Sequence, residues 1–367
     1  MPRYAAWLER TLKERGHHVD LIKPEPFLAR LTRNPFLSKY LGYLDKFLLF
    51  PPRLRRMAKK YDLVHVADQA NSMYLNVVRN RPRLITCHDL LAIRSARGEF
   101  PNWPTGWSGK LLQRWILSGL RSAPHVLCVS RKTEDDLKKL IGRDGPKMRM
   151  IYNALNWNFR SGATLSEGLI SRLGIRSSQP YLLHVGGNLW YKNRIGALRI
   201  FARLAETNEY SVVRLIMAGE PFTDEMWNVI REEKLDDRVV EATFVTNEEL
   251  RELYSNALAL LFPSLEEGFG WPILEAQACG CPVTTTNRPP MSEVGGDAAI
   301  YIDPAAPKAA AAAITAGLKY SGELRGAGFR NLKRFDEKEI VDNYLSFYET
   351  TLADTPEISG IIVGQQS

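Results

Sequence analysis

Cysteine is scarce in this sequence, and so are the residue patterns that hold metal ions. The 367 residues include four cysteines, and no two of them form a C-x-x-C pair. Three of the four follow or lie among apolar, strand-like residues, which is typical of buried free thiols in a reducing compartment. No Asp-x-Asp pair lies near an expected strand end, and no His/Cys cluster has metal-ligand spacing. We therefore expect neither a disulfide framework nor a bound metal or cofactor.

Long hydrophobic runs are missing, and acidic residues are nearly missing from one segment. No apolar run approaches the roughly 18 residues that a bilayer-spanning helix needs, and residues 1–15 show a charged helical pattern instead of a secretory signal. The net charge of +8 is concentrated in residues 1–80, which hold fifteen Lys/Arg and seven Asp/Glu. Between Arg30 and Lys60 there are nine basic residues and one acid, Asp45. This segment is therefore expected to attract an anionic partner.

Large apolar side chains are interleaved with these cations. They are Phe36, Tyr40, Tyr43, Phe47, Leu48, Leu49 and Phe50. Basic side chains beside exposed aromatics suit an anionic membrane surface, at about 1 kcal/mol per cation near the lipid. We predict that residues 30–60 bind such a surface and that the protein is cytoplasmic and peripheral on the inner face of the membrane. Two alternatives stay open: a helix with core aromatics and solvated cations, and a nucleic-acid surface, which we do not expect because no nucleic-acid motif accompanies the segment.

Length and periodicity predict a two-domain α/β protein. A chain of 367 residues is long for one core, and its 45% hydrophobic and 25% charged residues are ordinary for a globular protein. Strand-like and helix-like segments alternate along it, which is typical of parallel sheets. This alternating pattern weakens from Asn156 to Gln179, with Ser and Gly residues between the periodic segments. We place one domain at 1–170, a second at 171–335, a helix at 336–352 and a tail at 353–367.

One stretch combines a strand, a glycine turn and a helix start. Residues 257–262 form an apolar run short enough for a buried strand, and Pro272 suits the first turn of the helix that follows. The turn Glu267-Gly268-Phe269-Gly270 lets a ligand approach the backbone closely, and the helix start offers N–H groups to an anion. Glu267 and Glu275 frame this turn, and their spacing fits two hydroxyl-bearing groups with a phosphate between them, as in a nucleotide sugar. The alternative is a solvated helix-start acid and a chance glutamate.

This spacing resembles the E-x7-E motif of the retaining glycosyltransferases of family 4, also called glycosyl transferases group 1. The matching residues are Pro263-Ser264, Glu267 to Gly270, Leu274-Glu275-Ala276, Gly280 to Val283, Ser292 to Ala299 and Asp303-Pro304. The resemblance implies the GT-B fold, with two Rossmann-like parallel-sheet domains that face a cleft, and with the 336–352 helix crossing back to the first domain. It also implies a metal-independent transferase of the hexosyltransferase type whose co-substrate is a UDP- or GDP-linked sugar.

The resemblance assigns donor binding to the second domain. Glu267 would hold the donor sugar, Glu275 the ribose and Lys192 the diphosphate, since a lysine just before a helix start can pair with phosphate by charge. The other donor-binding residues would be Gly187, Asn188, Val245, Gly268, Phe269 and Gly270, with Val245 near the base. Gly187 stands where many family members have an arginine, so that Arg194 or the helix terminus would have to compensate.

The first domain would take the acceptor side. His88 follows an expected strand at Arg83–Cys87 and matches the family's N-domain histidine, which could donate to a sugar hydroxyl. Its alternative is a strand-end histidine bonded to local backbone. Asn153 and Trp103 are assigned to the acceptor cleft, and their alternatives are a turn former and an anchor for the loop at residues 98–108.

The first strand of the expected N-terminal sheet and the glycine-rich turn after it are expected to be absent, or to lie upstream of an incorrectly chosen start. Residues 4–15 form the helix that would follow it, Gly16 ends this helix, and His18–Ile22 is expected to be a strand. Family members place a strand and a glycine-rich turn before this helix. A sheet without that strand would expose unpaired backbone groups.

These features together predict a retaining glycosyltransferase that moves a sugar from a nucleotide-sugar donor to a lipid-linked or saccharide acceptor in cell-surface polysaccharide synthesis. Glu267, His88 and Lys192 are its expected catalytic residues. One alternative is a nucleotide-sugar epimerase or hydrolase on the same fold. Another is a catalytically weak or inactive sugar-nucleotide-binding remnant, because Gly187 and the absent first strand both depart from the family pattern.

Overall fold

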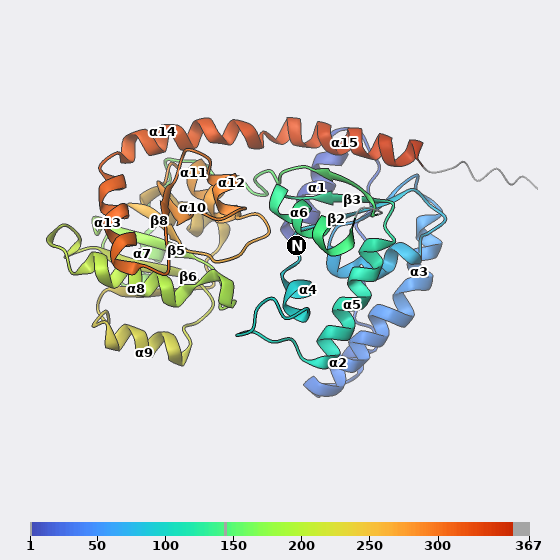
Figure 1. The fold of residues 1–367 in the computed structure, drawn as a ribbon, viewed down its shortest axis with the longest axis horizontal. Helices are drawn as coiled ribbons and strands as arrows, with labels where there is room; N and C mark the ends of the chain where they lie inside the picture. Colours follow the sequence, from blue (N-terminus) through green and yellow to red (C-terminus); the bar gives the residue numbers. More distant parts are fainter. Residues whose placement is uncertain (1, 143–144, 355–367) are drawn as a thin grey trace, which may run out of the picture. The chain divides into compact units, whose positions relative to one another are not determined.

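The computed structural model describes residues 2–142 and 145–354 and divides into two units, each with its own parallel sheet (Figure 1). The first unit runs to Val129 and also contains Glu134–Ile151 and the segment from Lys338. The second contains Ser130–Thr133 and Tyr152–Glu337. The first unit thus gives way to the second after Ile151, whereas the sequence analysis placed the domain boundary at residue 170. Most of the expected tail at 353–367 lies outside the described residues.

The first unit contains a four-stranded parallel sheet in the order β1-β2-β3-β4. Its strands are β1 (Val64–Val66), β2 (Arg83–Cys87), β3 (His125–Cys128) and β4 (Lys147–Met150). The helices and helical turns around it are α1 (Pro2–Glu14), η1 (Ala29–Leu31), α2 (Pro35–Leu44), η2 (Asp45–Leu49), α3 (Phe50–Ala58), η3 (Gln69–Asn76), α4 (Leu91–Ala96), α5 (Trp107–Arg121), most of α6 (Arg131–Ile141) and α15 (Glu337–Ala353). The central strands are almost wholly buried, which agrees with a parallel sheet covered on both faces.

The expected strand at His18–Ile22 is not formed. Residues 17–26 have no regular structure, and β1 pairs only with β2 among the described residues. A strand needs a ladder partner for its N–H and C=O groups, and none of the described strands pairs with these residues. In place of that strand, α1 and α15 bury side chains against the sheet, where the Tyr4 hydroxyl hydrogen bonds to Thr86 Oγ1 at 2.9 Å and to the Tyr344 hydroxyl at 3.0 Å.

Local sequence explains the continuous helical segment formed by α2, η2 and α3. Asn34 caps α2 by accepting hydrogen bonds from the N–H groups of Phe36 and Leu37 at 2.9 and 3.3 Å. Two prolines occupy the first turn of α3, where their missing N–H groups cost nothing. The Asp45 carboxylate is buried and accepts hydrogen bonds from the backbone N–H groups of Leu28 and Ala29 at 2.8 and 3.0 Å. These hydrogen bonds join the helical segment to the coil that precedes it.

The second unit contains a six-stranded parallel sheet in the order β10-β9-β8-β5-β6-β7. Its strands are β5 (Tyr181–Val185), β6 (Arg214–Gly219), β7 (Val239–Thr243), β8 (Ala259–Phe262), β9 (Val283–Thr286) and β10 (Ile300–Ile302). The helices and turns are α7 (Glu167–Leu173), η4 (Trp190–Lys192), α8 (Arg194–Ala205), η5 (Asn208–Tyr210), α9 (Asp224–Glu232), α10 (Asn247–Asn256), α11 (Trp271–Ala278), α12 (Met291–Gly295), α13 (Pro307–Leu318), α14 (Ser321–Asn331) and η6 (Leu332–Phe335). The chain winds outward in both directions from β5, so the strand order reverses between β5 and β8.

Two further findings concern composition. The four cysteines are buried and free, as expected from their positions among apolar residues. No helix within the described ranges is long and apolar enough to cross a bilayer.

Candidate active site

The candidate site lies where the loops after β5 and β8 meet. In open parallel sheets, ligands bind at the carboxyl ends of the strands where the strand order reverses. β5 and β8 are paired at that point, with Leu182 opposite Ala259. The backbone N–H of Leu265 donates to the Tyr191 carbonyl at 2.7 Å, and Asn193 Nδ2 donates to the Pro263 carbonyl at 3.0 Å. These two hydrogen bonds fasten one loop to the other.

Lys192 and Glu267 form an ion pair across these loops. Lys192 Nζ lies 2.7 Å from Glu267 Oε1, and the side chains are only 17% and 9% exposed. Lys192 Nζ also lies over the Phe262 ring at 5.4 Å. The next residue, Asn193, has a left-handed backbone and caps α8 by accepting from the N–H of Gly196. The structure therefore brings two of the three expected catalytic residues, Lys192 and Glu267, together at a helix N-terminus, where a partly dehydrated cation can meet an anionic ligand.

The glycine turn leads directly into α11. Gly270 has φ of 102°, a left-handed conformation that glycine adopts without strain, and α11 starts at the next residue with a proline in its first turn. The Gly268 carbonyl accepts hydrogen bonds from the Ser130 hydroxyl at 2.8 Å and the Thr133 hydroxyl at 3.2 Å. The Phe269 side chain is buried, so Phe269 can offer a ligand only its backbone. Sequence reasoning missed Ser130 and Thr133, although their hydroxyls flank a strand end.

Glu275 lies in the interior of the second unit. It is 1% exposed, about one turn into α11, and its Oε2 accepts a hydrogen bond from the Tyr254 hydroxyl at 3.1 Å. Burial, followed by the charge of Glu275, raises the pKa of Tyr254 well above its ordinary value, so the hydroxyl stays a donor. The carboxylate is thereby held in a fixed orientation beneath the start of α11.

Gly187 faces a carboxylate instead of a second cation. A Cβ atom at Gly187 would lie 3.0 Å from Glu220 Oε2, and the backbone N–H of Asn188 donates to the same oxygen. Arg194 does not replace the missing arginine in this arrangement: its buried guanidinium donates to Asn188 Oδ1 and the Glu220 carbonyl and lies over the Phe222 ring. Glu220 was not predicted, and its position directly after an apolar strand was the signal for it.

Val245 follows the edge strand β7 in the same sheet. The residue before it, Phe244, is 90% exposed and has φ of 54°, which is unusual for a residue with a side chain. Thr246 then starts α10 through a reciprocal cap with Glu249. Arg172 donates to the Thr243 carbonyl at 3.0 Å and pairs with Glu249. The backbone around Val245 is therefore fixed from both sides.

His88 directly follows β2 in the first unit, and its side chain is 3% exposed. Its Nε2 lies 2.9 Å from the Ala67 carbonyl, and its backbone N–H donates to Gln69 Oε1 at 2.9 Å. Burial lowers the pKa of His88 to about 4, so the imidazole is neutral at physiological pH. It packs edge-on against the Tyr4 ring at 4.6 Å. The geometry agrees with the local-backbone interpretation and leaves the sugar contact as a prediction.

Asn153 and Trp103 differ in their surroundings. Asn153 belongs to the second unit, is 1% exposed, and neither its Oδ1 nor its Nδ2 has a hydrogen-bond partner among the described residues. Trp103 belongs to the first unit, is 42% exposed, and its carbonyl accepts from the Ser95 hydroxyl at 2.8 Å. Buried amides are normally paired, so Asn153 has the character of a ligand-binding side chain.

Comparison with known proteins first defines the class of fold. Sucrose-phosphate synthase from Thermosynechococcus elongatus superposes with a TM-score of 0.72 at 20% identity, covering 95% of this chain and 93% of that one. HepE from Anabaena, solved with UDP and glucose, has a TM-score of 0.68 at 19% identity over 93% and 89% of the two chains. Two parallel-sheet units of this kind define the GT-B fold, which confirms the sequence-based expectation.

The family follows from the sequence. Residues 167–327 match the family described as Glycosyl transferases group 1, and residues 1–158 match Glycosyltransferase Family 4. This chain belongs to that family of glycosyltransferases. The O-antigen chain mannosyltransferase RfbU of Salmonella typhimurium is 28% identical over 226 residues, which are 61% of this chain and 57% of RfbU. The match thus spans little more than half the length of this relative.

Proposed function

We propose that this protein is a retaining glycosyltransferase that moves a sugar from a nucleotide-sugar donor to a lipid-linked or saccharide acceptor in cell-surface polysaccharide synthesis. The observation that carries the proposal is the Lys192–Glu267 pair at the reversal of strand order, between the start of α8 and the glycine turn of α11. Two comparisons support it: RfbU is named as an O-antigen chain mannosyltransferase, and HepE was solved with UDP and glucose.

The donor is a UDP- or GDP-linked sugar. Its diphosphate replaces Glu267 as the ion-pair partner of Lys192. Lys192 is only 17% exposed, so its charge acts on the phosphate with little screening by water. The N–H groups from Gly268 to Gly270 add donors at the start of α11. Glu275 holds the ribose hydroxyls and the backbone at Val245 holds the base. The diphosphate is bound by these groups and not by a metal ion.

In the reaction, a hydroxyl oxygen of the acceptor forms a bond to the anomeric carbon while the bond from that carbon to the diphosphate oxygen breaks. The acceptor proton goes to the departing diphosphate, so attack comes from the same face and the configuration is retained. Lys192 and the glycine-turn amides offset the charge that develops on the leaving group. Glu267, released from Lys192, accepts hydrogen bonds from the donor sugar, and neutral His88 donates one to a sugar hydroxyl.

The enzyme acts at the cytoplasmic face of a membrane as a peripheral protein, and the basic segment at residues 30–60 supports this part of the proposal. Residues 30–60 contact the anionic lipid surface there, which keeps the enzyme near lipid-linked acceptors. No nucleic acid is involved.

A library of radiolabelled UDP- and GDP-sugars, tested with and without membrane extract, examines the proposal directly. The expected result is label in lipid-extractable or polymeric product that depends on the extract. Free sugar alone would indicate a hydrolase, and an isomerised nucleotide sugar would indicate an epimerase. Because Glu220 fills the space beside Gly187, an inactive sugar-nucleotide-binding remnant is the second candidate. Donor binding in a calorimeter without any product would favour that remnant.

A further inference from the structure

Five aromatic rings form a continuous row on the first unit. We call Phe36, Tyr40, Tyr43, Phe47 and Trp115 the aromatic ladder. Successive ring centroids along the ladder are 4.8, 6.3, 5.9 and 5.1 Å apart. The first three members are 71%, 51% and 42% exposed, so the ladder starts in solvent on α2 and reaches α5 through η2. Aromatic side chains in mutual contact, which a core would usually bury, are here partly exposed at the surface.

Helix α5 continues this surface from the last member of the ladder. Trp107, Leu111 and Trp115 repeat every four residues, which places them on one face of the helix. They are 81%, 60% and 45% exposed, whereas the C-terminal half of α5 is buried against the core. Trp107 therefore does not anchor the loop at residues 98–108 to the core. Trp115 contacts Phe47 of η2, whereas Trp107 and Leu111 lie exposed on this face.

The charges around the ladder are almost all positive. Residues 30–60 carry nine Lys/Arg, and α5 carries three more and no acid. The lone acid, Asp45, is buried and satisfied by the backbone of Leu28 and Ala29, so it does not act as a counter-ion at the surface. Arg53 pairs with Glu25 at 3.0 Å, and we count it as neutralised. Lys46 interacts by charge with Asp68, and the remaining cations lie in the same segment as the exposed apolar side chains.

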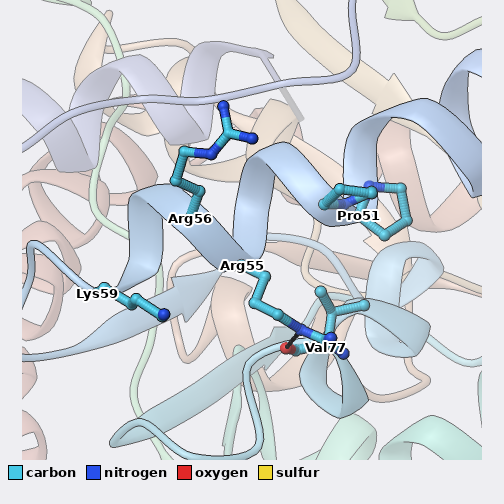
Figure 2. Close-up of a pocket in the computed structure, with 6 residues that line it drawn as sticks. Pro51, Arg55, Arg56, Lys59 and Val77 are labelled. Carbon is cyan, nitrogen blue, oxygen red and sulfur yellow. Dashed lines mark hydrogen bonds between the residues drawn. The ribbon is translucent and has the colours of Figure 1, made fainter.

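Three of these cations line one surface cavity. Arg55 and Arg56 of α3 and Lys59 directly after it line a cavity of about 340 Å³ together with Pro51, Pro52 and Val77. Figure 2 shows that the charged ends point in different directions, with Arg55 toward Val77 and Arg56 away from it. Arg55 Nε donates to the Val77 carbonyl at 3.4 Å. The cavity therefore presents three separate cations, each of which can meet a phosphate oxygen of an anionic surface.

We propose that the aromatic ladder and the exposed face of α5 insert into an anionic phospholipid bilayer, and that Arg55, Arg56 and Lys59 contact lipid phosphates at its surface. This inference rests on the membrane contact of the proposed function and assigns that contact to particular side chains. Rings at the headgroup level with cations beside them are the pattern of an interfacial anchor. A second copy of this chain fits the surface poorly, because it would bring two sets of uncompensated cations together.

Flotation of the full chain with vesicles tests the apolar part. Vesicles of pure phosphatidylcholine are compared with vesicles that contain 30% phosphatidylglycerol, at low and high salt (roughly 50 and 500 mM). Binding to the anionic vesicles and its loss at high salt are expected. The double variant Trp107→Gln with Leu111→Gln should lower the apparent affinity at least about tenfold. The matched control is Val212→Gln with Tyr320→Gln, which changes two equally exposed apolar residues of the second unit.

A second pair of variants tests the cavity. Arg55→Gln with Arg56→Gln should lower the affinity for anionic vesicles about thirtyfold, since each cation near lipid contributes about 1 kcal/mol. The control Lys308→Gln with Lys319→Gln removes two exposed cations of the second unit and should leave binding unchanged. Circular dichroism and donor binding of each variant show that the protein is folded.

Several outcomes would overturn the inference. They are equal binding of wild type to neutral and anionic vesicles, wild-type affinity in the Trp107 and Leu111 variant, and a concentration-dependent dimer that this variant dissolves. Vesicle binding and donor binding are measured separately, so the two proposals fail separately. A protein that binds donor but no vesicles removes only the membrane anchor. A protein that binds vesicles but no donor removes only the sugar-transfer proposal.

Discussion

At the scale of single residues, two anionic groups would compete for the ammonium group of Lys192: the carboxylate of Glu267 and the diphosphate of the donor. Lys192 bonds to Glu267 at 2.7 Å in the structure, and a donor diphosphate would compete for the same ammonium group. The two residues should therefore respond differently to substitution. Under the proposed function, Lys192 would contribute to binding of the diphosphate, whereas Glu267 would bind the sugar and oppose binding of the diphosphate.

Replacing Lys192 by Gln should weaken binding of UDP or GDP by about 10- to 100-fold, the usual effect of losing a charged hydrogen bond. Glu267→Gln should bind the same nucleotide at least as tightly as wild type, because Lys192 is then unpaired, while its transfer rate falls by about 10²-fold or more. Calorimetry with the nucleotide alone and the radiolabel assay measure the two effects. Lys319→Gln, an exposed lysine of the same unit, is the control. Equal losses of nucleotide affinity in both variants would contradict the competition.

Three histidines predict how stability depends on pH: His88 and His184 are buried, and His65 is partly buried. Burial, assisted by the charge of His88, lowers the pKa of His65 to about 3, and burial lowers the pKa of His88 to about 4 and of His184 to about 3. The unfolded chain, with histidine pKa values near 6.5, binds more protons than the folded chain below that pH. The stabilisation is therefore complete above about pH 6.5 and is lost as the pH falls toward 3 to 4.

We expect the free energy of unfolding to fall by about 2 kcal/mol for each of these histidines between pH 7 and pH 5. Urea unfolding at both pH values measures this change. The variant His17→Gln, at an exposed position, should show the same pH dependence as wild type. A free energy of unfolding that stays constant from pH 7 to pH 5 would be inconsistent with three neutral imidazoles that are buried or partly buried.

At the scale of elements, the ends of β5 and β6 approach so closely that one glycine controls their spacing. A Cβ atom at Gly219 would lie 2.1 Å from the carbonyl oxygen of Gly186. Gly219→Ala should therefore separate the two strand ends, disturb the loop that carries Lys192, and cost more than about 2 kcal/mol of stability. Thermal unfolding and calorimetric nucleotide binding should both show the loss.

Gly168→Ala provides the control for this substitution. Gly168 lies in α7 with open space around its Cα, so alanine should leave nucleotide binding unchanged and stabilise the helix slightly. A Gly219→Ala protein with wild-type stability and nucleotide affinity would show that the strand ends can move apart without harm.

How much of these elements could be predicted from the sequence depends on the range of the interactions. The strand, glycine turn and helix around Gly268 could be predicted because apolar runs, glycine and proline act locally. The error at His18–Ile22 was not local: its pattern suits a strand, but strand formation depends on a ladder partner, and none of the described strands pairs with these residues. Glu220 beside Gly187 and the Tyr254 bond to Glu275 join residues 33 and 21 positions apart, and no periodicity shows such pairs.

The basic segment shows the same limit. Its composition indicated an anionic partner, but composition could not separate Phe50, which is 5% exposed and packs in the core, from Phe36, which is 71% exposed. Trp115 joins the aromatic ladder from an element about 70 residues further along the chain. Only the folded arrangement shows that these rings form one surface.

At the scale of the whole molecule, the two ends of the described chain meet in the first unit. Arg15 Nη2 lies 2.7 Å from Asp342 Oδ1, and Asp354 accepts hydrogen bonds from Lys147 and His125 at 2.7 and 2.8 Å. Helices from the start and end of the chain thus complete a sheet that has only four strands. The buried hydroxyl of Tyr4 lies at the centre of this contact between the helices and the sheet, because it hydrogen bonds to both Thr86 and Tyr344.

Tyr4→Phe should lower the free energy of unfolding by about 1 to 3 kcal/mol, since it removes two buried hydrogen bonds and leaves the Tyr344 hydroxyl without that partner. Urea unfolding measures the change, and Tyr320→Phe, at a site that is 62% exposed, should stay within about 0.5 kcal/mol of wild type. Thr86→Val breaks the same network, so its effect and that of Tyr4→Phe should not add in the double variant. Additive effects, or wild-type stability in Tyr4→Phe, would mean that the sheet is closed by apolar packing alone and that the hydroxyl network contributes nothing to it.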